Sequence, residues 1–254
     1  MWDLNTTGVA TSVGRDQVTF LAGFDSEQDG QAALAAVAGS PLVLASPAPL
    51  LEPVDPEGWY QPEAQSDIEI PTTPPVNLKL TVGPAFGHGH HPTTAIALDL
   101  MSRWLRGGQR VLDFGAGTGI LGLAALAMGA ERVTAIEIDP AAIGIAKLNL
   151  GANRPVVGSR TMTFHTEIDD AVRVGRPYEL VVANVLVGVH RANAQPIIAL
   201  LDPAGVTPPC PQTARTVIVA GILNHQLAEV VEAYAPLKMV DSIEIDDWVG
   251  AVLQ

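Results

Sequence analysis

The sequence of 254 residues contains a single cysteine, Cys210, and its aromatic and charged residues make up only 5% and 16% of the chain. One cysteine cannot form an internal disulfide or a cysteine-based zinc site, so disulfide scaffolds are excluded and a reducing compartment is indicated. The longest nearly apolar stretch, Ile120 to Ala130, is too short to span a bilayer. The N-terminus lacks a basic region followed by an apolar block, so we expect no secretory signal and a cytoplasmic protein.

Basic residues are almost absent from the first 75 residues, which hold eleven acids and one base, Arg15. The remaining residues hold sixteen acids and thirteen bases, so most of the formal net charge of −13 belongs to the N-terminal part. Such a charge repels nucleic acid and anionic lipid and attracts a basic partner. We therefore expect no direct nucleic-acid binding and no membrane association, with acids that only keep a surface soluble as the alternative.

The chain divides into three segments. Residues 1–45 combine a β-like run with an Ala-rich helical run, Glu27 to Val37, and predict a small α+β module. Nine prolines lie from Pro41 to Pro75, and proline lacks a backbone N–H and fixes φ. Residues 46–75 are therefore expected to be a Pro-rich acidic linker with at most edge-strand segments. Residues 76–254 are the large domain.

The large domain alternates between short apolar strands and helices. Strands are expected at Arg110 to Phe114, Arg132 to Ile138, Tyr178 to Ala183 and Thr216 to Ala220. Helices are expected at Gly119 to Met128, Pro140 to Leu150, His190 to Leu201 and Asn224 to Tyr234. This order predicts a doubly wound α/β fold, with a mostly parallel sheet covered by helices on both faces. The last two strands, Lys238 to Ile245 and Trp248 to Leu253, leave no room for a crossover helix and predict an antiparallel C-terminal hairpin.

The segment Val111 to Gly119 is the most informative part of the sequence. A strand runs into glycines at every second position, Gly115, Gly117 and Gly119, and a helix follows. The backbone can therefore approach a ligand closely at the carboxyl end of the strand. Glu137 lies at the end of the next strand, 22 residues after Gly115, where its carboxylate can accept hydrogen bonds from both hydroxyls of a ribose.

Two cofactors compete for this arrangement. The run Gly117 to Gly122 fits the dinucleotide fingerprint, which favours a nicotinamide cofactor. An acid, Asp113, stands two residues before Gly115, and a carboxylate beside the loop disfavours a pyrophosphate. It suits a ligand that carries an ammonium group, such as S-adenosylmethionine. We favour S-adenosylmethionine and keep a nicotinamide-dependent enzyme on the same fold as the alternative.

A histidine-rich segment, Gly83 to Thr94, precedes an amphipathic helical run. Pro92 suits a first helical position, so the hydroxyls and amides of Thr93 and Thr94 are expected to be free to hold a carboxylate. His90 and His91 are adjacent and cannot easily converge on one ion, so no metal site is predicted. A substrate-facing histidine and a solvated loop are the two interpretations that we retain.

Four motifs together resemble a known family. They are Phe86 to Thr94, Asp113 to Leu121, Ala135 to Pro140 and Val182 to Leu186, and the likeness spans about Val82 to Leu253. In combination they resemble the methyltransferases that modify large-subunit ribosomal protein eleven. The chain departs from the family pattern at His88, where threonine is usual, and at Glu137, where aspartate is more frequent. It also has a Pro-rich insertion at residues 203–213.

The resemblance implies a class I, Rossmann-like methyltransferase domain preceded by a small domain that recognises the ribosomal protein. It implies transfer of methyl groups from S-adenosylmethionine to lysine side chains and to the N-terminal amine of a basic ribosomal protein. The cofactor contacts are expected at Thr94, Asp113, Gly115, Gly117, Glu137 and Asn184.

Three residues are candidates for the chemistry itself. Asn184 resembles the polar residue that faces the acceptor amine. His88 and His90 are candidates for relaying the proton that the amine must lose. We expect a monomer, and a methyltransferase for another protein or a small-molecule amine is a further alternative.

Overall fold

The structure is a computed structural model, and it describes residues 6–13, 18–24, 27–38, 65–72, 74–81, 89, 91–173, 178–201 and 215–254. The chain forms two compact units, Met1–Trp59 and Tyr60–Gln254. In the first unit, the strands β1 (Thr6–Val13) and β2 (Val18–Phe24) pair antiparallel, and the helix α1 (Glu27–Ala38) follows. These elements agree with the small α+β module that the sequence predicts.

The second unit contains a seven-stranded sheet with the order β10-β11-β9-β8-β5-β6-β7. Its strands are β5 (Arg110–Phe114), β6 (Arg132–Ile136), β7 (Thr161–His165), β8 (Leu180–Asn184), β9 (Thr216–Leu223), β10 (Met239–Ile245) and β11 (Trp248–Leu253). Five neighbouring strands of the sheet, β9, β8, β5, β6 and β7, are parallel to one another. The strand β11 pairs antiparallel with both β9 and β10. The predicted parallel sheet with an antiparallel C-terminal hairpin is confirmed.

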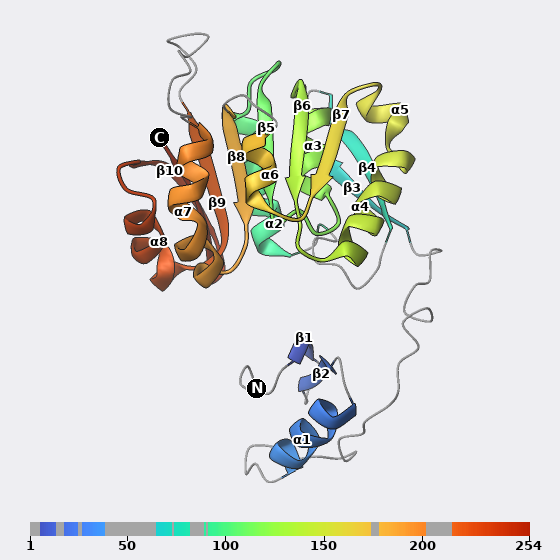
Figure 1. Ribbon diagram of the computed structural model, residues 1–254. Coiled ribbons are helices and arrows are strands. Elements are labelled where there is room, and N and C mark those ends of the chain that lie inside the picture. Colours follow the sequence, from blue (N-terminus) through green and yellow to red (C-terminus); the bar gives the residue numbers. More distant parts are fainter. Residues whose placement is uncertain are drawn as a thin grey trace. The chain divides into compact units, whose positions relative to one another are not determined.

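Helices cover both faces of this sheet (Figure 1). They are α2 (Pro92–Trp104), α3 (Ile120–Ala127), α4 (Pro140–Ala152), α5 (Arg154–Val157), α6 (Ile168–Arg173), α7 (Val187–Leu201), the 3-10 helix η1 (Asn224–Gln226) and α8 (Leu227–Ala233). One apolar core packs α2 to α5 on one face, and a second core packs α6 to α8 on the other. Along β9, Val217 and Val219 enter the second core while Ile218 and Ala220 enter the first. The strand is therefore buried on both faces, as a doubly wound fold requires.

Part of the segment expected to be a linker is folded into the larger unit. The strand β3 (Gln65–Ile70) pairs antiparallel with β4 (Val76–Thr81), and Ile68 and Ile70 belong to the first core. The pairing ends at Ile70 and resumes at Val76, so prolines lie in the connection and not within the strands. The compact unit thus begins before residue 76.

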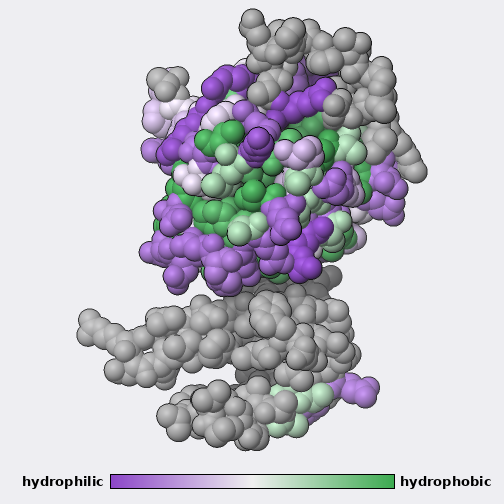
Figure 2. All heavy atoms as spheres, turned by 90° about the vertical axis from the view of Figure 1, so that its left-hand side faces the viewer, coloured by the Kyte–Doolittle hydropathy of each residue, from purple (hydrophilic) through white to green (hydrophobic). Residues whose placement is uncertain are grey.

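The strand β10 forms one edge of the sheet, and Figure 2 looks onto this side of the molecule. Apolar side chains gather in the middle of this side and are bordered by hydrophilic ones (Figure 2). Met239 and Val240 on β10 are 45% and 48% exposed. Among the helices of the described residues, none combines the length and the apolar character that crossing a bilayer demands.

Asn149 in α4 and Asn153, the C-cap of the same helix, bind the outer edge of β4. The Oδ1 atoms of Asn149 and Asn153 accept from the amides of Thr81 and Lys79, each at 2.8 Å. Residues four apart on a helix are separated by roughly 6 Å and residues two apart on a strand by roughly 6.6 Å, so the spacings match. Both asparagines are buried, at 0% and 1% exposure. The side-chain amides of the two asparagines therefore bond to the edge of β4 in the way that the backbone of a neighbouring strand would.

Asn153→Ala is expected to lower the free energy of unfolding by about 2 kcal/mol, because the Nδ2 of Asn153 also donates to the Lys79 carbonyl and both backbone groups would lose a partner. Urea denaturation measures this loss. Asn193→Ala is the matched control, since the Nδ2 of Asn193 bonds only within its own helix, to the Val189 carbonyl, and is exposed. An equal loss in the two variants would contradict the role of Asn153.

Candidate active site at the carboxyl edge of the sheet

The strands β5, β6, β8 and β9 are parallel, so their carboxyl ends lie at one edge of the sheet, here called the carboxyl edge. The N-terminus of α2 is at this edge as well. The rings of His91 and Trp248 lie edge to face with centroids 4.9 Å apart, and Trp248 pairs with Leu223, the last residue of β9. Residues from five elements distant in the sequence therefore meet at the carboxyl edge.

The glycine loop, residues 115–119, connects β5 to α3. In space it lies beside the carboxyl end of β6. The amides of Gly115 and Ala116 donate to the Ile136 carbonyl at 2.9 and 3.0 Å. Gly115 has a φ of 77°, and a Cβ on it would overlap the side chain of Val185. A larger residue would therefore be strained and would push the loop away from the end of β8.

The Asp113 carboxyl lies beneath this loop and is fully buried. Its Oδ2 accepts from the amide of Gly122 in the first turn of α3 at 2.8 Å. The N-cap residue of α3 is Gly119, which has no side chain for this purpose. Asp113 therefore caps α3 from the neighbouring strand, while its Oδ1 has no hydrogen-bond partner.

Burial raises the pKa of Asp113 to about 7, the Gly122 hydrogen bond opposes the rise, and the charge of Glu137 adds to it. The sequence predicted Asp113 as a residue that touches the cofactor. The structure shows that one of its oxygens supports the helix that follows the loop.

Glu137 fixes the loop from the other side. Its Oε2 accepts from the Gly117 amide at 2.9 Å, and its Oε1 accepts from the Asp139 amide at 3.0 Å. The side chain is partly exposed. Because each carboxylate oxygen can accept more than one hydrogen bond, both oxygens keep capacity for the hydroxyls of a ribose. Glu137 follows β6 as the sequence predicted.

The helix α2 begins at Pro92, as predicted. More of the polar groups in its first turn have hydrogen-bond partners than the sequence analysis expected. The Nδ1 of His91 accepts from the Thr93 amide at 3.3 Å and lies 2.8 Å from the Thr93 hydroxyl, and the Thr94 amide donates to the His91 carbonyl at 2.9 Å. Of the four groups expected to be free, only the Thr94 hydroxyl is without a partner. Burial lowers the pKa of His91, which keeps the ring neutral and able to accept. His91 is therefore the N-cap of α2.

Two predicted catalytic residues, His88 and His90, lie outside the described residues. Asn184, the third, is the last residue of β8 and is only 9% exposed. Its Oδ1 has no partner and would lie 3.0 Å from a Cβ on Gly221. Gly221 has a φ of 83°, and a side chain there would also press on the backbone of Val185. The glycine thus keeps the space beside Asn184 open.

A buried histidine that the sequence analysis did not single out supports Asn184 from behind. The Nε2 of His190 lies 2.9 Å from the carbonyl of Ala220, which pairs with Asn184, and its Nδ1 lies 3.2 Å from the Tyr234 hydroxyl. Burial lowers the pKa of His190 and raises that of Tyr234. A neutral His190 therefore donates from Nε2 to Ala220 and accepts at Nδ1 from Tyr234. These bonds join α7 to β9, beside Asn184, and to Tyr234 at the end of α8.

Four buried polar side-chain atoms among the described residues lack a hydrogen-bond partner, and three belong to predicted site residues. They are Thr94 Oγ1, Asp113 Oδ1, Asn184 Oδ1 and His165 Nε2. Such atoms are rare in folded proteins because each costs free energy unless a ligand or water satisfies it. His165 was missed by the sequence analysis. It ends β7, beside β6, and its Nδ1 lies 3.8 Å from an Asp170 oxygen. The residues at this edge therefore fit a polar ligand.

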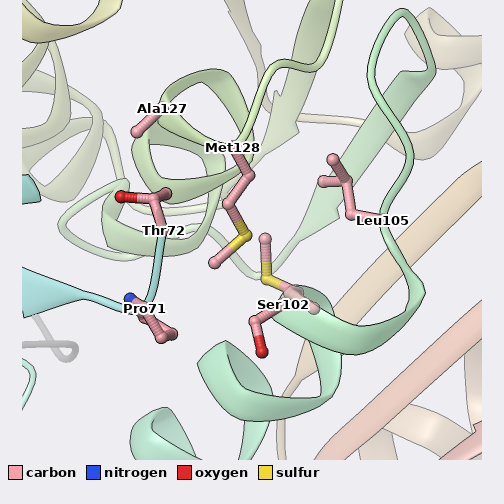
Figure 3. Close-up of a pocket in the computed structure, with 7 residues that line it drawn as sticks. Pro71, Thr72, Ser102, Leu105, Ala127 and Met128 are labelled. Atoms are coloured by element: carbon pink, nitrogen blue, oxygen red, sulfur yellow. The ribbon is translucent and has the colours of Figure 1, made fainter. Parts of the chain in front are cut away.

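A hollow on the larger unit lies away from these residues (Figure 3). It is lined by residues near the C-terminal ends of α2 and α3 and after β3, namely Pro71, Thr72, Met101, Ser102, Leu105, Ala127 and Met128. These helix ends point to the opposite edge of the sheet, and no predicted site residue lines the hollow. Within the described ranges, no group of three or more histidine, cysteine or acidic side chains is placed to hold a metal ion.

Comparison with known proteins agrees with this geometry. A family model described as ribosomal protein L11 methyltransferase (PrmA) matches residues 53–254. A ribosomal protein L11 methyltransferase of Idiomarina loihiensis is 39% identical over 185 residues, which are 71% of this chain and 56% of that protein. One from Actinobacillus pleuropneumoniae serotype 3 is 35% identical over 245 residues, which are 89% and 77% of the two chains. The chain thus spans little more than half the length of the Idiomarina relative.

A solved structure is also similar. The ribosomal protein L11 methylase of Lactobacillus delbrueckii subsp. bulgaricus superposes with a TM-score of 0.56 at 25% identity, over 68% of this chain and 83% of that one. The matched residues include β5, β6 and β8 with the glycine loop, Glu137 and Asn184. The resemblance found in the sequence is therefore confirmed, and the chain belongs to the ribosomal protein L11 methyltransferase family.

Proposed function

We propose that this protein is a cytoplasmic S-adenosylmethionine-dependent methyltransferase that modifies amines of a basic ribosomal protein. The acceptors would be lysine side chains, the N-terminal amine or both, and the ribosomal protein named by its relatives, L11, is the first candidate. The observation that supports this best is the group of partnerless polar atoms, Thr94 Oγ1, Asp113 Oδ1 and Asn184 Oδ1, in motifs that the family model covers.

The residues of the carboxyl edge would hold the donor. Glu137 would accept from the ribose hydroxyls, and the amides of the glycine loop would face the nucleoside. The Thr94 hydroxyl at the start of α2 suits the donor's carboxylate, because a helix N-terminus favours negative charge. The Asp113 carboxyl suits its ammonium group. When bound, S-adenosylmethionine supplies a methyl group on a positively charged sulfur.

The acceptor amine needs a site that takes up its N–H groups. A lysine amine is almost entirely protonated near pH 7, so the site must favour the neutral form with its lone pair. Asn184 Oδ1 would accept from the amine and orient it, while the low exposure of Asn184 keeps water away. We propose that His88 or His90, on the segment that leads into α2, passes the released proton to solvent.

The N-terminal unit would recruit the protein substrate. Its sequence is strongly acidic, since residues 1 to 59 hold eight acids and one base. An acidic unit attracts a basic protein and raises the rate of encounter. The unit ends at Trp59, whereas β3 belongs to the larger unit, so a deletion that tests recruitment should stop at residue 59.

Glu137→Ala is expected to weaken binding of S-adenosylhomocysteine at least about tenfold, because hydrogen bonds to a charged group contribute about 1.5–3 kcal/mol and the Gly117 amide loses its anchor. Glu137→Asp keeps the carboxylate and should retain most of the affinity. Isothermal titration calorimetry measures both, with Glu131→Ala as an exposed control. Unchanged affinity of Glu137→Ala for S-adenosylhomocysteine would overturn the proposed donor site. The same conclusion would follow if the wild-type protein bound NADH and not S-adenosylhomocysteine.

Asp113→Asn is expected to flatten the dependence of stability on pH between about pH 4 and 7. A carboxyl whose pKa is raised in the folded state is most stabilising when protonated, so the wild type loses stability as pH rises through this range. One pKa unit corresponds to about 1.4 kcal/mol, and we expect the wild type to lose about 1–3 kcal/mol more than the variant. Urea denaturation at several pH values tests this. Parallel curves for the two proteins would contradict it.

Removal of residues 1–59 is expected to raise the KM for the unmethylated ribosomal protein at least about fivefold at low salt, and to leave affinity for S-adenosylhomocysteine unchanged. The difference in KM should shrink as salt is added, because salt screens exposed charges. Methylation kinetics from 50 to 500 mM salt measure this. An unchanged KM would refute recruitment by the N-terminal unit.

A further inference from the structure

The charged residues of the larger unit are sorted between the two edges of its sheet. Five basic residues stand at the start of a strand or directly before it, at the edge opposite the active site: Arg110, Arg132, Arg160, Arg215 and Lys238. The acids Glu131 and Glu179 also lie at that amino edge. The acids at the carboxyl edge follow β6, β7 and β10: Glu137, Asp139, Glu167, Asp169, Asp170, Asp246 and Asp247. In the sequence these acids and bases are interspersed, so only the topology reveals the separation.

Lysine and arginine are absent from the described segments that form the carboxyl edge. The segments that follow the carboxyl ends of β5 to β10, up to the next helix or strand, contain neither lysine nor arginine. The basic side chains that the described residues place at this edge are histidines: His91 before α2, His165 at the end of β7 and His225 in η1. A positively charged molecule that approaches this edge therefore meets carboxylates without a competing lysine or arginine in these segments.

The acids form two groups on either side of the site. The strand order places Asp246 and Asp247 at the β10-β11 end of the sheet and Glu167 and Asp169 at the β7 end. Adjacent strands lie about 4.8 Å apart, so the two groups are separated by roughly 30 Å. Asp247 is tied to the edge because its carbonyl accepts from the Asn224 amide at 3.0 Å, just after β9. A protein segment, and not a small molecule, spans such a distance.

An independent observation points to a ligand between the two groups. Asn184 ends the central strand β8, is 9% exposed, and leaves its Oδ1 without a partner beside the space that Gly221 keeps open. The Thr94 hydroxyl, fully buried at the start of α2, is also without a partner. These atoms favour a polar molecule in the middle of the edge that the acids flank.

We propose that these two acidic groups form a docking surface on the catalytic domain itself for a lysine- and arginine-rich protein segment that carries the acceptor amine. This inference rests on the proposed function. Exposed carboxylates contribute little affinity singly, but together they orient and speed the approach of a cationic segment. The basic amino edge repels the same segment, so the charge separation directs it to the edge where Asn184 lies.

The test compares two sets of three substitutions in the full chain. Glu167→Gln, Asp246→Asn and Asp247→Asn neutralise exposed acids of the two groups, none of which holds the donor. Glu69→Gln, Glu131→Gln and Glu232→Gln neutralise three exposed acids elsewhere and change the net charge equally. The substrate is unmethylated recombinant ribosomal protein L11. In 50 mM salt we expect the first set to raise KM about five- to tenfold, with kcat and affinity for S-adenosylhomocysteine unchanged, and the second set less than twofold.

The expected increase in KM should nearly vanish in 500 mM salt, because salt screens exposed charges. Equal effects of the two sets, or an unchanged KM in the first, would overturn the docking surface. If the wild type methylates nothing in L11, the proposed function fails, and the direct affinity of both variants for L11 then decides the docking inference alone. Urea denaturation of both variants checks that they are folded.

Discussion

Two carboxylates hold the glycine loop, and the rest of the site depends on this support. Asp113 at the end of β5 accepts from Gly122 beyond the loop, and Glu137 at the end of β6 accepts from Gly117 within it. Three of the five loop residues are glycines, which have no side chains to fix the loop and lose the most backbone entropy on folding. The carboxylates supply the missing order from the adjacent parallel strands.

Hydrogen bonds of Asn149 connect the glycine loop to another part of the larger unit. The Nδ2 of Asn149 donates to the Thr118 carbonyl at 2.9 Å, and its Oδ1 accepts from Thr81, so the glycine loop is joined to β4. The strand β4 leads towards the histidine-rich segment and α2, which carries Thr94. One buried amide therefore links the two halves of the proposed donor site, and we expect movements of the two halves to be coupled through it.

Two histidines of the larger unit have structural roles. His91 caps α2 and His190 joins α7 to β9, and burial lowers the pKa of both, so they remain neutral hydrogen-bonding groups. Proton transfer during the proposed reaction needs a group that can change its charge, and His88 and His90 remain the predicted candidates for it. Five bases lie at the amino edge and seven acids at the carboxyl edge, where we propose that the amine enters.

Local patterns in the sequence were sufficient for much of the fold. The strand Arg110–Phe114 and the hairpin strand Trp248–Leu253 were predicted with their observed bounds, because each is a short apolar run between turn signals. The strand β7 was missed, although its Thr161–His165 alternates polar and apolar residues. The β3-β4 hairpin was missed because prolines on both sides suggested a linker, and only its packing against α3 and α4 explains it.

The sequence by itself predicted a strand, a glycine loop, a helix and a spaced acid, and with them a nucleoside site, since these features follow one another along 27 residues, 111 to 137. It also placed Asn184 at a strand end. Tertiary structure alone decided that Asp113 caps α3, that Gly221 leaves room beside Asn184, and that acids gather at one edge of the sheet. These depend on residues far apart in the chain, and their proximity is set by the order of strands in the sheet, which spacing along the sequence does not contain.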